Sequence, residues 1–146
     1  MGSSKLIRVY VGSSGFELFH CGHLALFKKA RSLGDFLIVG VSSDETLIRW
    51  WRESGDTTRR PIIPDNQRYE IIKNCKLVDE VVEDAPYETT KEFIIKNKID
   101  LVVRGDSDFL ERYKDPVGMG MFRAVGYTEG ISTTKIIEEI ISRIKS

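Results

Sequence analysis

The chain of 146 residues has little of several features that define common classes of protein. Its two cysteines, Cys21 and Cys75, are too few for the disulfide framework of a small secreted domain. No apolar run approaches the ~20 residues that a membrane-spanning helix needs, and no signal peptide is visible. Lysine plus arginine balances aspartate plus glutamate at 22 each, which argues against a basic, nucleic-acid-binding surface. We therefore expect a cytoplasmic protein with no stable membrane insertion and no nucleic-acid partner.

What remains is the composition of one ordinary domain. Apolar residues make up 41% of the chain, and its length suffices for a real core. The sequence shows no internal repeat and no low-complexity segment. We expect residues 1–4 to be a disordered leader and residues 5–146 to form a single domain.

Strand-like apolar runs alternate with helix-like segments along the whole chain. The expected strands are 6–11, 36–42, 78–82, 99–104 and 121–125. The expected helices are 24–33, 44–52, 65–74, a segment ending at 97, and a final one from 132 onward, with loops at 53–64 and 106–120. Asp65, Thr89 or Thr90, and Ser132 are the expected helix caps. The alternation predicts an α/β fold, a Rossmann-like doubly wound parallel sheet of about five strands with helices on both faces.

The two histidines of the chain stand three residues apart in a glycine-rich stretch, Gly15-Phe16-Glu17-Leu18-Phe19-His20-Cys21-Gly22-His23. This stretch joins the first expected strand to the first expected helix. A helix N-terminus offers unpaired N–H groups and the positive end of the helix dipole, and imidazoles donate hydrogen bonds to phosphate oxygens. We therefore predict a nucleotide phosphate site at this turn.

Zinc is the rival ligand, because His20, Cys21 and His23 are all residue types that bind it. No second ligand cluster follows, since Cys75 stands alone. We therefore expect no resident metal among these side chains. Cys21 is interpreted as a helix-start residue rather than a nucleophile.

A second polar run, Thr128-Glu129-Gly130-Ile131-Ser132-Thr133-Thr134, opens the last expected helix. Capping by Ser132 alone would explain one residue of this run but not the whole. We interpret the run as a second anion-binding helix start that faces the first. The polar clusters follow the expected strands, and the carboxyl ends of parallel strands share one edge of a sheet. We therefore predict one site built from several loops.

Together these runs resemble the cytidylyltransferase family. The histidine stretch is similar to the family signature G-x-F-D-x-x-H-x-G-H, and 128–134 is similar to R-T-E-G-I-S-T-[ST]. Lys76–Val82 resembles Arg-Tyr-Val-Asp-Glu-Val-Val, and Ala85-Pro86-Tyr87 resembles Ala-Pro-Trp or Ala-Pro-Tyr. The likeness runs from about residue 6 to 144 and is greater to the choline-phosphate and ethanolamine-phosphate branch than to the glycerol-phosphate branch.

The resemblance implies an enzyme of phospholipid precursor synthesis that moves a cytidylyl group from CTP to phosphoethanolamine or phosphocholine. The products would be a CDP-alcohol and pyrophosphate, the cofactor Mg²⁺, and the assembly a homodimer. The residues that the resemblance assigns to catalysis are His20, His23, Arg60 and Thr128. Those assigned to the nucleotide are Gly12, Ser13, Ser14, Gly15, Phe16, Gly22, Gly105, Asp106, Gly130, Ile131, Ser132, Thr133 and Thr134. Those assigned to the second substrate are Glu17, Arg59, Lys76, Tyr87, Tyr113 and Tyr127, with the tyrosines at 87 and 113 as an aromatic wall for an ammonium group.

Three positions depart from the family pattern. Tyr127 stands in place of the signature arginine, Glu17 in place of aspartate, and Lys76 in place of arginine. Removing one charge-stabilising donor typically costs ~2.7–4 kcal/mol of barrier. We expect Arg123, Arg104 or Arg60 to supply the missing charge. The alternatives left open are a glycerol-phosphate acceptor, an adenylyltransferase, and a weakly active or non-catalytic nucleotide-binding relative.

Overall fold

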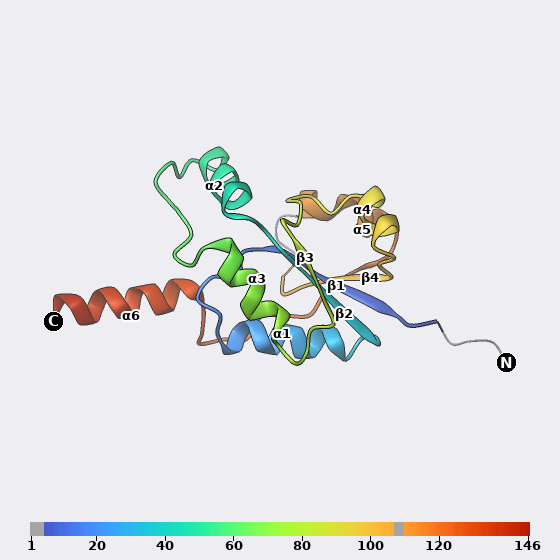
Figure 1. Cartoon of the computed structure of the whole chain (residues 1–146), viewed down its shortest axis with the longest axis horizontal. Helices are drawn as coiled ribbons and strands as arrows, with labels where there is room; N and C mark the ends of the chain where they lie inside the picture. Colours follow the sequence, from blue (N-terminus) through green and yellow to red (C-terminus); the bar gives the residue numbers. More distant parts are fainter. Residues whose placement is uncertain (1–4, 107–109) are drawn as a thin grey trace.

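Five parallel strands form the centre of the protein in a computed structural model, which describes residues 5–106 and 110–146. In sheet order these strands are β3 (Glu80–Glu83), β2 (Phe36–Val41), β1 (Arg8–Ser14), β4 (Leu101–Arg104) and β5 (Phe122–Ala124). The expected leader lies outside the described residues, as do residues 107–109 of the expected 106–120 loop. The order reverses beside β1, so the topological switch point lies between β1 and β4 (Figure 1).

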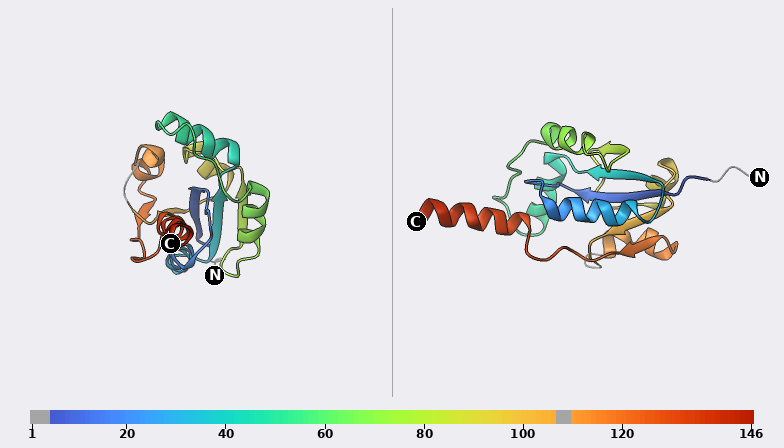
Figure 2. Two further views of the ribbon diagram at one scale, coloured as in Figure 1. Left: turned by 90° about the vertical axis from the view of Figure 1, so that its left-hand side faces the viewer. Right: turned by 90° about the horizontal axis from the view of Figure 1, so that it is seen from below.

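Helices cover both faces of the sheet, as the sequence predicts (Figures 1 and 2). The helices α1 (Cys21–Arg31) and α3 (Asp65–Lys73) lie on one face, and α4 (Lys91–Lys96) and α5 (Lys114–Gly118) lie on the other. A short 3-10 turn, Leu110–Tyr113, precedes α5. The remaining helices are α2 (Asp44–Glu53), at the carboxyl end of β2, and α6 (Thr133–Lys145), which projects away from the body of the domain.

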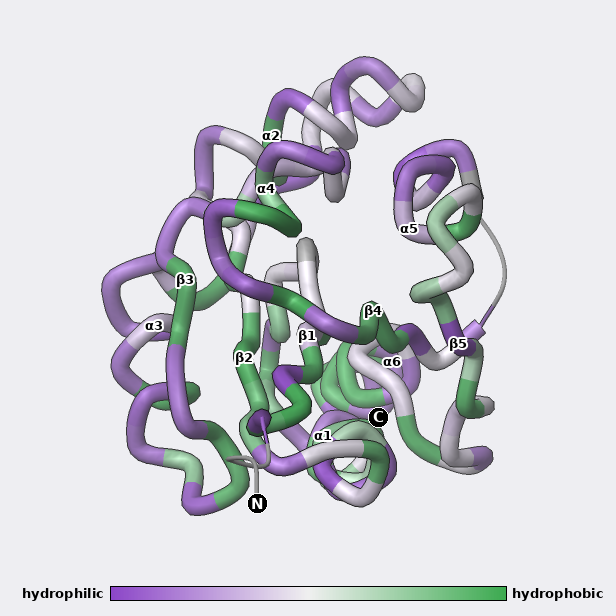
Figure 3. Tube along the Cα trace, turned by 90° about the vertical axis from the view of Figure 1, so that its right-hand side faces the viewer, coloured by the Kyte–Doolittle hydropathy of each residue, from purple (hydrophilic) through white to green (hydrophobic). Residues whose placement is uncertain are grey.

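The alternating directions of strand side chains divide the core into two clusters. Val9, Val11 and Val39 face α1 and α3, whereas Tyr10 and Ile38 face the other helices. All five are buried, and Figure 3 shows β2 in the green of hydrophobic residues along most of its length. Runs that are apolar on both faces are typical of a parallel sheet covered on both sides.

Two boundaries differ from the sequence prediction for clear physical reasons. The first strand begins at Arg8 rather than Leu6, and it runs on to Ser14 because β2 pairs with it along that length. The first helix begins at Cys21 rather than Leu24, because the two histidine side chains satisfy its first N–H groups.

The predicted caps Thr90 and Ser132 each accept a hydrogen bond from the backbone N–H three residues on, at 3.1 Å. Asp65 does not cap its own helix. Pro64 occupies the cap position, and the carboxylate of Asp65 accepts from the Asp44 N–H at the start of α2.

The apolar stripe of α6 is not packed on the domain: Ile140, Ile141 and Ile144 are exposed. None of the described helices combines the length and the apolar character that a membrane crossing requires.

A buried arginine joins the segments that surround the carboxyl ends of the strands. Arg68 of α3 is only 1% exposed. It donates to the carbonyls of Gly15 (2.9 Å), Ser42 (2.7 Å) and Ile63 (2.9 Å), and to the carboxylate of Asp44 (2.7 Å). The guanidinium thereby fixes the histidine turn, the end of β2, the start of α2 and the 54–64 loop relative to one another.

Replacing this guanidinium should destabilise the whole fold. For Arg68→Met we expect the free energy of unfolding to fall by about 3 kcal/mol or more, because buried carbonyls and the Asp44 carboxylate lose their donor. Urea denaturation measures the change. The matched control is Lys73→Met on the same helix, whose surface ion pair with Glu83 should contribute within about 1 kcal/mol. Equal losses in the two variants would contradict the assigned role of Arg68.

Candidate functional site

Both imidazoles form the cap of α1. The Nδ1 atom of His20 accepts a hydrogen bond from the Gly22 N–H at 3.0 Å, and the Nδ1 atom of His23 accepts from the His20 N–H at 3.1 Å. The two rings stack with centroids 3.8 Å apart. Phe19 stacks on the other side of His23, with centroids 5.3 Å apart. This packing leaves each ring a single orientation.

These hydrogen bonds determine what the rings can offer a ligand. An Nδ1 atom that accepts an N–H carries no proton, so each neutral imidazole holds its proton on Nε2. Burial lowers the pKa of His20. Burial, and then the neighbouring charge of His20, lower the pKa of His23 to about 4. Near neutral pH the site therefore presents neutral Nε2–H donors, which suit phosphate oxygens.

The start of α6 lies beside the start of α1. Ser132 caps α6, and the Thr133 hydroxyl donates to the backbone carbonyl of Glu17 at 3.0 Å. A hollow separates the two helix starts, and we call it the helix-start hollow. It is lined by His20, Gly22, His23, Leu26, Tyr127, Thr128, Gly130, Ile131, Ser132, Thr133 and Lys135.

Two further hollows share His23 with the helix-start hollow. The tyrosine hollow is lined by Val11, Gly12, Ser14, Phe16, His23, Leu26, Val103, Arg104, Gly105 and Tyr127. The arginine hollow is lined by Ser14, Gly15, Phe16, Glu17, His23, Leu47, Trp50, Trp51, Arg59, Arg104, Arg112 and Thr133. His23 thus lines all three hollows, which meet at the switch point of the sheet.

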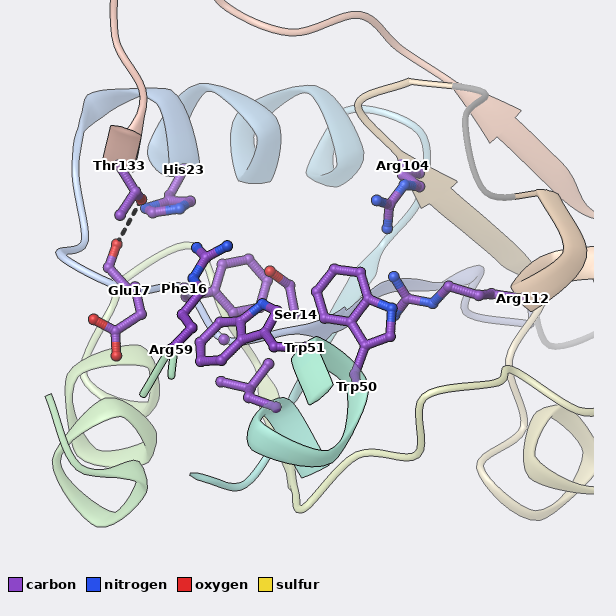
Figure 4. Close-up of a pocket in the computed structure, with 12 residues that line it drawn as sticks. Ser14, Phe16, Glu17, His23, Trp50, Trp51, Arg59, Arg104, Arg112 and Thr133 are labelled. Carbon is purple, nitrogen blue, oxygen red and sulfur yellow. Dashed lines mark hydrogen bonds between the residues drawn. The ribbon is translucent and has the colours of Figure 1, made fainter. Parts of the chain in front are cut away.

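The arginine hollow has two distinct ends (Figure 4). Glu17, His23 and Thr133 lie at one end, and Arg104 and Arg112 lie at the other, beyond the indole of Trp50. The guanidinium of Arg59 lies between them, 4.2 Å from the ring centroid of Trp51. The wall is therefore cationic and aromatic, which suits an anionic ligand.

Glu17 serves the turn as well as the hollow. Its Oε1 accepts the N–H groups of Ile62 (3.0 Å) and Ile63 (3.2 Å), and it lies 3.8 Å from the Arg68 guanidinium. The Oε2 atom is buried and has no hydrogen-bond partner among the described residues. The carboxylate thus ties the loop that carries Arg59 to the histidine turn.

Tyr127 closes the tyrosine hollow over β4. Its ring lies against Gly105, where a Cβ atom would come within 2.1 Å of a ring carbon. Although Tyr127 is 58% exposed, partial desolvation where it lies over β4 raises its pKa, so its hydroxyl stays protonated. Arg104 lies beside it, and its Nε donates to Asp106 at 3.0 Å. Of the three arginines expected to replace the signature charge, Arg104 is the one that lines the hollows next to Tyr127.

Other residues predicted for the site lie outside the three hollows. Arg123 is exposed. Because β5 ends at Ala124 and the chain bends at Gly126, Arg123 and Tyr127 do not lie along one continuous strand. Arg60 is exposed and does not line the arginine hollow, whereas Arg59 does. Lys76 precedes β3 and so lies at the opposite edge of the sheet. Three more residues do not line any of these three hollows: Asp106, Tyr113 and Thr134. The predicted Ser13 side chain lies outside the described part of the structure.

Tyr113 and Tyr87 have defined structural contacts. The Tyr113 hydroxyl donates to the Gly12 carbonyl at 2.7 Å and accepts from Arg104 at 2.9 Å, so it supports the floor of the tyrosine hollow. Tyr87 packs on Trp50, with ring centroids 5.6 Å apart. It lines a separate shallow hollow with Glu88, Glu111 and Arg112.

Sequence reasoning missed Trp50, Trp51 and Arg112, which line the arginine hollow. The tryptophan pair lies in a segment interpreted only as a helix, and Arg112 lies in one interpreted as a loop. A pair of tryptophans just after a strand, on the site edge of the sheet, was the available signal. Nothing in the local sequence marks Arg112.

Zinc ligation finds no support in the described geometry. No three potential ligands among histidine, cysteine, aspartate and glutamate gather within residues 5–106 and 110–146. Both cysteines there are free, and Cys21 is exposed. The Nδ1 atoms of His20 and His23 are already engaged by backbone N–H groups.

Comparison with known proteins agrees with this geometry. The sequence profile of the cytidylyltransferase-like family matches residues 9–139. The chain belongs to the cytidylyltransferase-like family. The sequence-based recognition of that family and the predicted α/β architecture are both confirmed.

Curated members of the family include proteins similar to this one over most of its length. The ethanolamine-phosphate cytidylyltransferase of Dictyostelium discoideum is 38% identical over 134 residues, which cover 87% of this chain and 36% of that protein. The choline-phosphate cytidylyltransferase A of Mus musculus is 37% identical over 142 residues, which cover 92% of this chain and 36% of that protein. The chain thus spans about a third of the length of these relatives.

A solved structure has the same fold. The lipopolysaccharide core biosynthesis protein from Thermoplasma volcanium GSS1 superposes with a TM-score of 0.64 at 27% sequence identity. The match covers 85% of this chain and all of that one. The two chains therefore share the same sheet and flanking helices over most of this chain.

The half-buried imidazole of His23, whose Nδ1 atom accepts the His20 N–H, should resist protonation. With two histidines in the chain, both ring C–H signals can be followed by proton NMR. We expect the His23 signal to titrate near pH 4 instead of 6.5. The unfolded chain binds a proton at higher pH than the folded one, so the free energy of unfolding should fall as the pH drops from 6.5 towards 4. A His23 midpoint near 6.5 would show that the Nδ1 cap does not persist in solution.

Proposed function

We propose that this protein transfers a cytidylyl group from CTP to a phosphoalcohol, with release of pyrophosphate. The observation that carries the proposal is the meeting of three hollows at His23, between two helix starts. Two reactants and a leaving group need such a junction. The family relatives named for ethanolamine-phosphate and choline-phosphate support phosphoethanolamine or phosphocholine as the acceptor.

The phosphates of the nucleotide would lie in the helix-start hollow. The N-termini of α1 and α6 border this hollow, so the positive ends of their helix dipoles lie beside it. The Nε2–H groups of His20 and His23 would donate to phosphate oxygens. The hydroxyl of Thr128 lies on the same wall. Their placement at the junction suits the charge that builds on the α-phosphate during transfer.

The acceptor phosphate would attack the α-phosphorus in line, from the arginine hollow. The new P–O bond forms as the bond to the leaving pyrophosphate breaks. A phosphate dianion is already nucleophilic, so no strong base is needed, and the low pKa of His23 fits a donor better than a base. Catalysis then consists of positioning and charge stabilisation. Arg59 would hold the acceptor phosphate, since it lines this hollow between its two ends.

Mg²⁺ fits the site as a cofactor held mainly by the nucleotide. Magnesium is commonly bound by one or two carboxylates together with substrate phosphates. Glu17 lines the arginine hollow, and its Oε2 is a buried acceptor without a partner among the described residues. Bound there, the ion would offset negative charge on the phosphates that meet at the junction.

The replacement of the signature arginine by Tyr127 need not abolish transfer, because Arg104 lines the same hollow. The proposal also includes a role in phospholipid precursor synthesis in the cytoplasm and a homodimeric assembly. These rest on family membership alone. Size-exclusion chromatography with light scattering decides the assembly.

The central test is pyrophosphate release on incubation with CTP, Mg²⁺ and phosphoethanolamine or phosphocholine. We expect turnover by the native protein and a loss of about 10²–10³ in kcat for His23→Ala, since a donor to the developing charge is removed. The matched control is Cys21→Ala on the same helix turn. Its exposed thiol contacts no proposed reactant, so turnover should be retained.

Other outcomes would replace the proposal. Tight CTP binding without pyrophosphate release would favour a non-catalytic nucleotide-binding protein. The reason to test this alternative is that Tyr127 stands in place of the signature arginine. Faster release from ATP than from CTP would identify an adenylyltransferase. Transfer to glycerol 3-phosphate in preference to both amino alcohols would move the acceptor to the glycerol-phosphate branch.

A further inference from the structure

The far end of the arginine hollow borders an aromatic enclosure. Trp50 of α2 lines the hollow, and Tyr87 packs beside it with ring centroids 5.6 Å apart. Tyr113, which is fully buried, adds a third ring. Such a group of ring faces is the arrangement that recognises a quaternary ammonium ion, through attraction to the faces.

In this protein a guanidinium already occupies the enclosure. The Cζ atom of Arg112 lies 4.1 Å from the ring centroid of Tyr87 and 5.5 Å from those of Trp50 and Tyr113. Its Nε donates to the Tyr87 carbonyl at 3.0 Å, and the residue is only 5% exposed. The guanidinium is therefore held firmly against the faces that an ammonium group would need.

The enclosure lies where the tail of an acceptor would reach. An acceptor phosphate reacting at His23 would point its alcohol along the arginine hollow, towards Trp50 and Arg112 (Figure 4). Arg112 lines both this hollow and the shallow hollow that contains Glu88 and Glu111. The carboxylates of Glu88 and Glu111 therefore lie next to the guanidinium at which an acceptor tail would arrive.

The two ammonium acceptors differ in how they can be recognised. A trimethylammonium group has no N–H, so its recognition depends on aromatic faces, and here the Arg112 guanidinium already occupies them. A primary ammonium has three N–H donors and can bind carboxylate oxygens without using the ring faces. Glu88 and Glu111, next to Tyr87 and Arg112, offer such oxygens.

We infer that Arg112 determines acceptor specificity by occupying the aromatic enclosure, so that the site accepts phosphoethanolamine and rejects phosphocholine. The inference rests on the proposed function, which assigns the arginine hollow to the acceptor. It makes Arg112 a selectivity residue, and it does not assign Arg112 a part in the transfer of the cytidylyl group.

The test compares kcat/KM for the two acceptors in the native protein, Arg112→Gln and Arg112→Lys. Glutamine keeps an N–H donor near the Tyr87 carbonyl but removes the charge, and lysine keeps the charge. We expect the native protein to favour phosphoethanolamine by about tenfold or more, because phosphocholine would find no free ring face and has no N–H to donate to a carboxylate instead. The preference should fall by about tenfold in Arg112→Gln and persist in Arg112→Lys.

A binding measurement separates this inference from the proposed function. Both tryptophans of the chain line the arginine hollow, so intrinsic fluorescence reports on it directly. Titration with tetramethylammonium chloride should leave the native and Arg112→Lys proteins unchanged and should quench Arg112→Gln saturably. A circular dichroism melt of each variant shows that it is folded.

The outcomes are distinguishable. Equal use of the two acceptors by the native protein, or saturable tetramethylammonium binding to it, overturns the inference and leaves cytidylyl transfer standing. Absence of pyrophosphate release with every acceptor overturns the proposed function. In that case saturable quenching by tetramethylammonium in Arg112→Gln alone would still show that Arg112 fills an ammonium-binding enclosure. If Arg112→Gln shows no saturable quenching, the assignment of the enclosure is overturned as well.

Discussion

The site depends on one guanidinium that is removed from water. Among the described residues, Arg68 alone donates at once to the histidine turn, the end of β2, the start of α2 and the long loop. Arginine suits this place because its five N–H donors lie in a rigid plane and stay charged at any physiological pH. Without the guanidinium, each of these carbonyls would be a polar group removed from water and left without this hydrogen-bond donor. The carboxyl edge of the sheet thus has a fixed shape before any ligand arrives.

The chemistry of the histidines follows from the same rigidity. Their Nδ1 atoms complete the backbone hydrogen bonding of a helix start, so the rings serve the fold and the ligand with different nitrogens. Two rings stacked at 3.8 Å would repel each other strongly if both were protonated. Positive charge near the proposed phosphate position therefore comes from arginines and helix dipoles. The imidazoles, whose pKa values are both lowered, contribute directed N–H donors.

Much of this arrangement could be predicted from the sequence because it depends on local patterns. Alternating apolar runs give the sheet, and hydroxyl residues before apolar periodicity give the caps at Thr90 and Ser132. The convergence of the two polar runs follows from their positions after strands of one parallel sheet. What could not be predicted depends on distant contacts. Arg68 looks like a surface residue of a helix until the turn folds over it, and Arg112 enters the aromatic enclosure only because the chain after β4 returns beside α2. Whether the apolar stripe of α6 is covered also lies beyond any local pattern.

The hydrogen bond between Thr133 and the Glu17 carbonyl has a consequence for the order in which the protein is made. It joins residues 116 positions apart, so the earlier half of the phosphate site is synthesised long before its partner. A nascent chain can pair β1 with β2 and β4, and β2 with β3, while the helix-start hollow still lacks one wall. The proposed nucleotide site has both of its walls only after the segment around Thr133 has left the ribosome and docked. Shorter nascent chains can therefore form the sheet without yet being able to capture the ligand.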